Sequence, residues 1–223
     1  MSRFVHSFSA RKKFRQCPDL FHKDRVLRLY PFVQGPEAKR GDDVHRHLAS
    51  FIGKAITIPA QYRDQLMPVA QAARDRQGKK LVEQKLGIRK DGSACSYFDE
   101  KVYTRCIIDY LNIDGNTAYV WDWKTGKDGY PDVDQLVENA VAVFAHYPDV
   151  KQVKALLVFV DHGTTADAEF SREYLSDYLD QVLSECAEID EVMELGEYEL
   201  TPGPLCPWCP VTDCKFWSAP RKK

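Results

Sequence analysis

The feature that most constrains the fold of this chain is a pair of segments separated by a short turn sequence. Residues 102–112 and 117–124 are rich in β-branched and aromatic side chains, and Asp114-Gly115 lies between them. An Asp-Gly pair between two such segments is the strongest short-range signal for a β-hairpin. With Asp114 and Gly115 as the loop residues, we predict an antiparallel hairpin in which Asp109 faces Val120 and Ile107 faces Asp122.

This hairpin predicts a group of charged side chains on one face. Side chains alternate between the two faces of a strand, so Asp109, Asp122 and Lys124 share a face, with the two acids roughly 7 to 8 Å apart as diagonal neighbours. Two carboxylates on one face repel each other unless a cation lies between them, and Mg²⁺ or Mn²⁺ prefers oxygen ligands. The alternative is a surface hairpin whose charged face is simply solvated.

The rest of the hydrophobic pattern predicts an α/β domain with a mixed central β-sheet flanked by helices. We expect strands over 80–90 and 153–161 in addition to the hairpin, and helices over 41–55, 60–77, 133–146 and 167–188.

The composition limits the classes of function. The net charge is -2, so a nucleic-acid site would be a local basic patch on a near-neutral molecule. No apolar segment is long enough to cross a bilayer, and the N-terminus lacks the apolar centre of a secretory signal. We therefore expect no membrane association and a cytoplasmic location, where the seven cysteines are better explained as metal ligands or core residues than as disulfides.

Three of these cysteines are spaced like metal ligands. Cys206, Cys209 and Cys214 form C-x2-C-x4-C, and Cys17 stands far upstream. A site of four cysteines suits zinc, whereas scattered thiols are the alternative reading. Cys95, Cys106 and Cys186 fit no such spacing and are expected to be small core residues.

An ordered set of motifs resembles the PD-(D/E)XK nuclease superfamily. The segment from Val120 to Gly126 contains D-x-K-T-G, and it follows a strand carrying Asp109. A G-x-x-x-H sequence ends at His45, and Gln135-Leu136 opens the helix after the D-x-K strand. The combination is similar to the RecB and AddB nuclease domains and to the CRISPR-associated Cas-four exonucleases. The family's tyrosine on that helix is replaced by Asn139, with Tyr130 and Tyr147 as alternative candidates.

The resemblance implies a restriction-endonuclease-like core and a set of site residues. By analogy with the family, Asp109, Asp122 and Lys124 are catalytic. A Mg²⁺ or Mn²⁺ ion is bound by His45, Asp109, Asp122 and the backbone carbonyl of Trp123. Glu83 resembles a glutamate on the first strand of the family, although a solvated or ion-paired residue fits the sequence equally well.

The same branch of the family implies a [4Fe-4S] cluster bound by Cys17, Cys206, Cys209 and Cys214. The C-terminal spacing is one residue shorter than is usual in the family, and Zn²⁺ is the alternative metal. We expect residues 1–223 to form one nuclease domain, in which 1–40 and 200–223 make an iron–sulfur module that joins the termini.

DNA is the expected partner, single-stranded or as the end of a duplex. Phe14, Phe21 and Tyr30 are candidates for stacking on bases, with a solvated amphipathic helix as the alternative for this segment. The side chains expected to contact DNA are those of Arg11, Lys12, Lys13, Glu83, Tyr130 and Gln135.

The function implied by these motifs is metal-dependent exonuclease activity on DNA ends, in recombination, repair or genome processing. A phage-encoded enzyme, acting in the host cytoplasm, fits the compact chain. The alternatives are a DNA-binding adaptor that keeps the nuclease fold, or a subunit that trims spacers for CRISPR adaptation. Besides DNA, the expected partners are a further copy of this chain, in a homo-oligomer, or a recombination or CRISPR protein.

Overall fold

The computed structural model describes residues 4–30, 33–129 and 131–218. The chain divides into two compact units, which we describe separately. Residues 34–182 form the central unit, and residues 1–33 with 183–223 form the terminal unit. No helix in the described part of the chain is long and apolar enough to cross a membrane.

The central unit is built on one six-stranded sheet, in the order β2-β1-β3-β4-β5-β6. Neighbouring strands are antiparallel except β4 and β5, which are parallel, so the sheet is mixed as predicted. The strands are β1 (Lys79–Ile88), β2 (Ala94–Ser96), β3 (Thr104–Asp114), β4 (Thr117–Lys124), β5 (Gln152–Phe159) and β6 (Thr164–Ser171).

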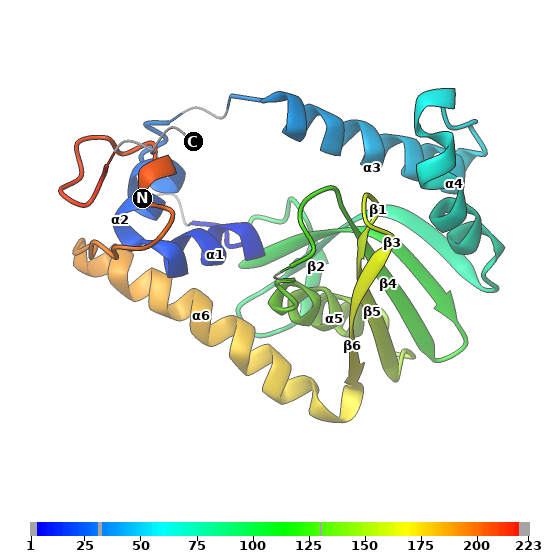
Figure 1. Cartoon of the computed structure of the whole chain (residues 1–223). Helices are drawn as coiled ribbons and strands as arrows, with labels where there is room; N and C mark the ends of the chain where they lie inside the picture. The colour runs from blue at the N-terminus through cyan, green and yellow to red at the C-terminus, as the bar shows by residue number, and fades with distance from the viewer. Residues whose placement is uncertain (1–3, 31–32, 130, 219–223) are drawn as a thin grey trace. The chain divides into compact units, whose positions relative to one another are not determined.

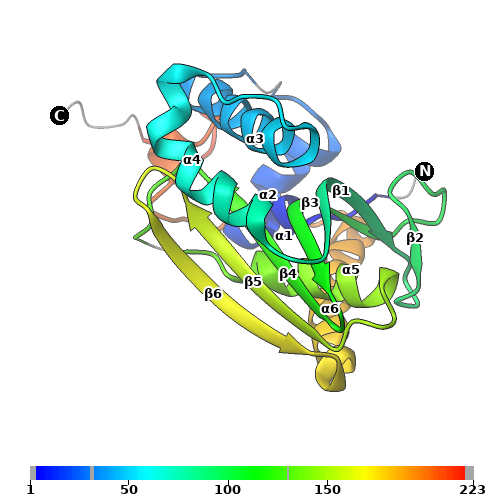
Figure 2. The same ribbon diagram turned by 90° about the vertical axis from the view of Figure 1, so that its right-hand side faces the viewer.

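Helices cover both faces of this sheet. Helices α3 (Pro36–Lys54) and α4 (Ala60–Asp75) lie on one face, and α5 (Asp134–His146) lies on the other (Figures 1 and 2). Pro36 occupies the first turn of α3, where its missing N–H has no helical partner to lose. The helix therefore begins before the predicted position 41.

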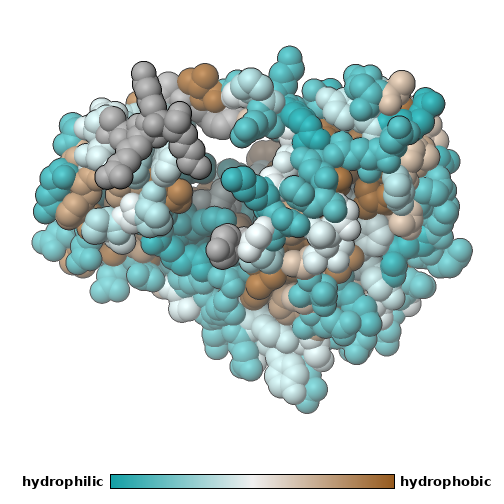
Figure 3. Space-filling model, in the orientation of Figure 1, coloured by the Kyte–Doolittle hydropathy of each residue, from teal (hydrophilic) through white to brown (hydrophobic). Residues whose placement is uncertain are grey.

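One core cluster lies between the sheet and the helices α3 and α4. Trp121 and Trp123 of β4 pack there against Tyr110 of β3, and all three are buried. Leu48 of α3 and Leu66 of α4 belong to the same cluster, so the two tryptophans pack beneath these helices. The outer surface over these helices is mainly hydrophilic, as Figure 3 shows.

The hairpin forms, but the predicted register is wrong. Asp114 pairs with Thr117, so that Gly115 and Asn116 are the two loop residues. Gly115 takes the left-handed conformation, which a residue without a Cβ adopts freely. Asp109 consequently aligns with Asp122 instead of Val120. The observed register differs from the predicted one by an even number of positions, so Asp109 and Asp122 still lie on the same face of the sheet.

The predicted helix over 167–188 is also partly wrong, because its first residues belong to β6. This strand lies at the edge of the sheet and contains only one buried apolar residue, Phe170. An edge strand that is mostly exposed lacks the apolar alternation by which strands are identified. A short 3-10 turn (Arg172–Tyr174) precedes α6 (Leu175–Leu195), which runs from the central into the terminal unit.

The terminal unit brings the two ends of the chain together. It contains α1 (Phe8–Gln16), α2 (Pro18–Phe21), a π-helical turn (His22–Val26), part of α6 and a 3-10 turn (Cys206–Trp208). Phe14 and Phe21 pack with Ala10 and Ile189 in a small core of their own. Both aromatic rings are buried, so they are not available to stack on DNA bases, contrary to the sequence-based expectation.

Candidate active site

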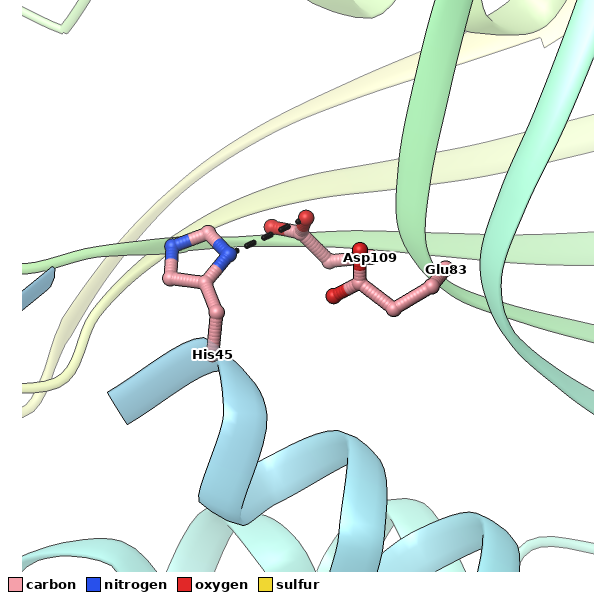
Figure 4. A group of neighbouring side chains, drawn as sticks. All are labelled: His45, Glu83 and Asp109. Atoms are coloured by element: carbon pink, nitrogen blue, oxygen red, sulfur yellow. Dashed lines mark hydrogen bonds and ion pairs between the residues drawn. The ribbon is translucent and has the colours of Figure 1, made fainter. Parts of the chain in front are cut away.

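Three side chains from three different elements meet beside the middle of α3. His45 of α3, Glu83 of β1 and Asp109 of β3 have ligand atoms that all lie within 4.8 Å of one another. Figure 4 shows the imidazole of His45 turned toward the carboxyl group of Asp109, and the Nδ1–Oδ1 distance is 3.2 Å. We call these three residues the acidic cluster. Imidazole and carboxylate groups in this arrangement can hold a divalent cation.

The carboxyl group of Asp109 is fixed from two sides. Its Oδ2 atom accepts a hydrogen bond from the backbone N–H of Trp123 at 2.8 Å, while Oδ1 faces His45. The hydrogen bond ties β3 to the D-x-K segment of β4. The backbone of Trp123 therefore positions one of the predicted metal ligands, whereas a role for its carbonyl oxygen as a ligand stays a prediction.

Asp122 and Lys124 form a second polar group with a helix residue. The Nζ atom of Lys124 lies 2.6 Å from Oδ2 of Asp122 and donates to Oε1 of Gln135 at 2.7 Å. Gln135, in the first turn of α5, donates in turn to Oδ1 of Asp122 at 2.5 Å. Asp122 therefore interacts with Lys124 and Gln135. The carboxylate that lies next to His45 and Asp109 in the acidic cluster is that of Glu83.

Burial makes the site electrostatically strained. Asp122 is only 4% exposed, and this desolvation, together with the charge of Asp109, raises its pKa to about 6. Burial also raises the pKa of Glu83, again with a contribution from Asp109. For His45, desolvation favours the neutral ring, but the hydrogen bond and charge of Asp109 outweigh it and raise the pKa. These are the shifts expected where carboxylates lie close together in a partly desolvated site.

Glu83 has an unusual backbone conformation, which accompanies the position of its side chain in the acidic cluster. It takes a left-handed conformation, with φ of 51°, and interrupts the ladder between β1 and β3 opposite Asp109. Residues an even number of positions apart on a strand normally point to the same face, but Tyr110 and Thr104 of β3 point to opposite faces. The hydroxyl of Tyr110 donates to the carbonyl oxygen of Ala73 in α4, whereas the hydroxyl of Thr104 donates to Glu138 in α5. The alternation of side chains therefore reverses between them. No signal in the sequence predicts this reversal.

A groove runs between α3 and β1 at the acidic cluster. It has a volume of about 640 Å³, and its walls include His45, Arg46 and Lys54 of α3 with Val82 and Glu83 of β1. Arg46 is ion-paired with Asp43. The groove leaves the cluster open to solvent on this side, as a site for a large substrate requires.

The structure corrects part of the predicted DNA-contacting set. Arg11 is 2% exposed and ion-paired with Glu185 at 2.9 Å, so it cannot reach DNA phosphates as predicted. Lys13 is paired with Asp24 at 2.6 Å, and Lys12 is exposed. Tyr130 lies outside the described residues.

Asn139 occupies the position of the tyrosine found in the family on α5. It lies one turn after Gln135, and its side chain is buried. Neither the oxygen nor the nitrogen of its amide has a hydrogen-bond partner among the described residues. It is therefore the least satisfied polar group next to the site.

The four predicted ligand cysteines line one cavity in the terminal unit. Cys17, Cys206, Cys209 and Cys214 all face this cavity, whose volume is about 260 Å³. Burial raises the pKa of the Cys209 thiol, with smaller contributions from the other three cysteines. The backbone N–H of Gly203 donates to Sγ of Cys206 at 3.2 Å. All four thiols are free, and the fold alone brings them to one place.

Comparison with known proteins gives one family model and 26 matching chains of solved structures, two of which are described below. A family model described as the PD-(D/E)XK nuclease superfamily matches residues 6–214. A crystal structure from Eubacterium rectale, named "Putative exonuclease", is 14% identical with a TM-score of 0.54, covering 98% of this chain and 90% of that chain. The structure of SSO0001 is 12% identical with a TM-score of 0.43, covering 92% and 82%, and supports no argument at this level. No curated protein matches the sequence.

Proposed function

Because this chain belongs to the PD-(D/E)XK nuclease superfamily, we propose that it is a metal-dependent exonuclease that hydrolyses phosphodiester bonds at DNA ends. The observation that carries the proposal is the convergence of His45, Glu83 and Asp109 within 4.8 Å, beside the Asp122–Lys124 pair. The motifs of the D-x-K strand and the G-x-x-x-H helix thus come together in one site open to a groove.

The donor atoms of the site suit Mg²⁺ or Mn²⁺. We propose that His45, Asp109 and Asp122 bind the ion, together with Glu83 and the carbonyl oxygen of Trp123. Burial and the charge of Asp109 raise the pKa values of both Asp122 and Glu83. A divalent cation between these carboxylates would offset that repulsion, which supports the assignment. A divalent ion held there would polarise a phosphoryl oxygen and acidify a water molecule.

The side chains of the chain supply the remaining parts of the mechanism. Lys124 carries an ammonium group beside the carboxylates, where it can orient the attacking water and stabilise negative charge that develops on the phosphoryl oxygens. Gln135 holds both Lys124 and Asp122, so it positions the two groups relative to each other. We propose that the main role of Gln135 is to position these two side chains, and not to contact DNA as the sequence predicted.

The decisive test is digestion of end-labelled single- and double-stranded DNA with Mg²⁺ or Mn²⁺. We expect release of labelled nucleotides by the native protein and a loss of at least a hundredfold in Asp122→Ala and Lys124→Ala, because each variant removes a group that acts on the reacting phosphate. A covalently closed circular substrate should resist digestion. Full activity in either variant would refute the mechanism, and degradation of the circle would refute the preference for ends.

Absence of digestion combined with tight DNA binding would instead favour the adaptor function. Labels at the 5′ and 3′ ends would give the polarity of digestion. Matched variants on the far side of the central unit, such as Lys151→Ala, should digest DNA like the native protein, because Lys151 lies at the opposite end of the sheet from Lys124.

We further propose that the terminal unit binds a [4Fe-4S] cluster through Cys17, Cys206, Cys209 and Cys214. Four thiols facing one cavity support a shared metal group. Zn²⁺ is the alternative metal for the same four thiols, because tetrahedral zinc sites also use four cysteines.

A further inference from the structure

Beyond Glu83, β1 and β3 present a face that the helices do not cover. Lys85 is paired with Ile107 across these strands, and Gly87 is paired with Arg105. Their side chains point away from α5, because Thr104, one position from Arg105, donates to Glu138 in that helix. Ile107 is 37% exposed and Lys85 is also exposed, whereas Ile108 beside them is buried.

Two aromatic residues lie beside the cations of this face. Tyr97 and Phe98 follow directly after β2, which pairs with β1. The guanidinium of Arg105 lies 4.5 Å from the centroid of the Tyr97 ring, and the ammonium of Lys85 lies 5.7 Å from that of Phe98. Phe98 is 74% exposed, which is unusual for a large apolar ring. We call Lys85, Tyr97, Phe98, Arg105 and Ile107 the stacking platform.

The loop that carries the rings is held in place by a glycine. A Cβ atom at Gly87 would lie 2.7 Å from the carbonyl oxygen of Ser96 and 3.0 Å from a side-chain atom of Val102. Only glycine allows the backbone of Ser96 to approach β1 this closely, and Ser96 directly precedes the two aromatic residues. The close approach therefore places the start of the loop against β1.

The charges of the platform are available to an anion. In the described part of the chain, no carboxylate is within ion-pairing distance of Lys85 or Arg105, and Asp99 of the same loop is paired with Arg89. Lys85 follows Glu83 by two residues, which is roughly 7 Å along a strand. The platform thus begins where the acidic cluster ends.

We propose that the stacking platform binds the single strand of nucleic acid that leads to the acidic cluster. Phosphates would contact Lys85 and Arg105, and unpaired bases would stack on Phe98 and Tyr97. Two cations beside the exposed ring of Phe98 and the half-buried ring of Tyr97 fit this ligand. Stacking of bases on rings tolerates any sequence but requires bases that are not paired. The proposal deepens the proposed nuclease function by assigning its substrate form, and it rests on that function for the role of the cluster.

The test measures binding of a labelled oligothymidylate by anisotropy in EDTA, where no metal-dependent cleavage occurs. We expect Phe98→Ala to weaken binding roughly tenfold and Phe98→Trp to restore it, because stacking is the contact removed. Lys85→Ala should weaken binding and reduce the slope of log affinity against log salt by about 0.7, the value for one phosphate of a single strand. The salt slope of Phe98→Ala should equal that of the native protein.

Control variants remove equivalent groups elsewhere in the central unit. Tyr174→Ala and Lys151→Ala delete an exposed ring and an exposed cation away from the platform, and they should bind like the native protein. Blunt duplex should be affected by Phe98→Ala less than twofold. Equal binding by native protein and Phe98→Ala, or equal losses for duplex and single strand, would overturn the proposal.

Digestion assays separate this inference from the proposed function. If DNA is cleaved and Phe98→Ala raises KM for single-stranded ends without changing kcat, the nuclease function and the role of the stacking platform are both supported. If DNA is cleaved but Phe98→Ala leaves KM unchanged, the proposed role of the platform is wrong and the nuclease function is still supported. If no DNA is cleaved but Phe98→Ala still weakens binding, the platform is a binding surface and the hydrolytic function fails.

Discussion

Trp123 donates its backbone N–H to Oδ2 of Asp109, which locks a carboxylate of β3 onto the backbone of β4. Asp109 therefore has hydrogen-bond partners for both oxygens, since Oδ1 faces His45. Asp122 is less well compensated. Its Oδ2 atom is buried and has only the ammonium of Lys124 beside it, without a hydrogen bond of good geometry. Asp109 and Asp122 therefore differ in how well their charges are compensated, and substitutions at the two positions should change the stability of the protein differently.

Asp122→Asn should stabilise the metal-free protein while abolishing nuclease activity. The pKa of Asp122 is raised to about 6 from an ordinary value of 3.8, so its ionisation destabilises the fold at neutral pH. The difference corresponds to about 2 to 3 kcal/mol at pH 7.5. Urea unfolding in EDTA would measure it.

The sign of this effect sets its pH dependence. Protonated Asp122 resembles asparagine, so the advantage of Asp122→Asn should be absent below about pH 4, grow between about pH 4 and 6, and stay constant above that. Asp109→Asn should give no such gain, because both oxygens of Asp109 are already engaged. A variant at position 122 that is less stable than the native protein at pH 7.5 would contradict the argument.

Glu83→Gly should be more stable than Glu83→Gln. Both variants lose the carboxylate, but only glycine relieves the left-handed backbone at this position, which is worth about 1 kcal/mol. Thermal unfolding of the two variants in EDTA gives the comparison. Both should bind Mn²⁺ more weakly than the native protein, and equal stabilities would mean that the backbone at Glu83 is not strained.

Asn139→Leu should stabilise the central unit. The buried amide has no partner for either polar atom among the described residues, and leucine has a similar volume without the need for one. A gain of about 1 to 2 kcal/mol is expected. The matched control is Asn112→Leu, which should destabilise, because Nδ2 of Asn112 donates to the carbonyl of Gln77 at 2.8 Å. The two variants should therefore shift the urea midpoint in opposite directions.

Arg172→Lys should destabilise the central unit. The guanidinium of Arg172 donates to the carbonyl oxygens of Phe144 and Tyr147 at the end of α5, and to that of Val150. Lysine cannot serve three acceptors in this fork, so we expect a loss of about 1 to 3 kcal/mol in urea unfolding. Lys154→Met, which removes an exposed ion pair with Glu169, should change stability far less.

An anaerobic preparation of the native protein should be brown, with broad absorption near roughly 400 nm from the proposed cluster. Cys209→Ser should lose this colour and lower the unfolding temperature, since Cys209 faces the shared cavity. Cys106→Ser, at a cysteine outside that cavity, should keep the colour. A colourless protein with one equivalent of zinc would replace the cluster by the alternative metal.

Much of the sheet could be predicted from the sequence, because the buried strands carry strong apolar signals. The hairpin of β3 and β4 and the strand β5 are of this kind, and so is α5, which is buried along most of its length. The exposed edge strand β6 could not be recognised, since its residues lack an apolar face. The hairpin register failed for a different reason, because Asp114-Gly115 and Gly115-Asn116 are both acceptable turn pairs.

The site was predictable only in part, for reasons of geometry. Strand alternation places Asp122 and Lys124 on one face, because they are two residues apart on one strand. Asp109 shares that face because the observed register differs from the predicted one by an even number of positions. The place of Glu83 in the acidic cluster depends on a left-handed residue that no local pattern announces. The pairing of Gln135 with Lys124 depends on how α5 docks, which is a tertiary fact.

The reversal at Glu83 has a consequence for how this protein tolerates change. Upstream of it, Val82 packs toward α3 and α4, whereas downstream Leu86 and Ile88 are buried with the opposite orientation. Insertion or deletion of a single residue between Glu83 and Ile88 would turn the buried side chains of β1 after Glu83 toward solvent. The part of the strand before Glu83 would keep its orientation. The stretch between Glu83 and Ile88 should therefore keep a constant length among homologues even where its residue types drift.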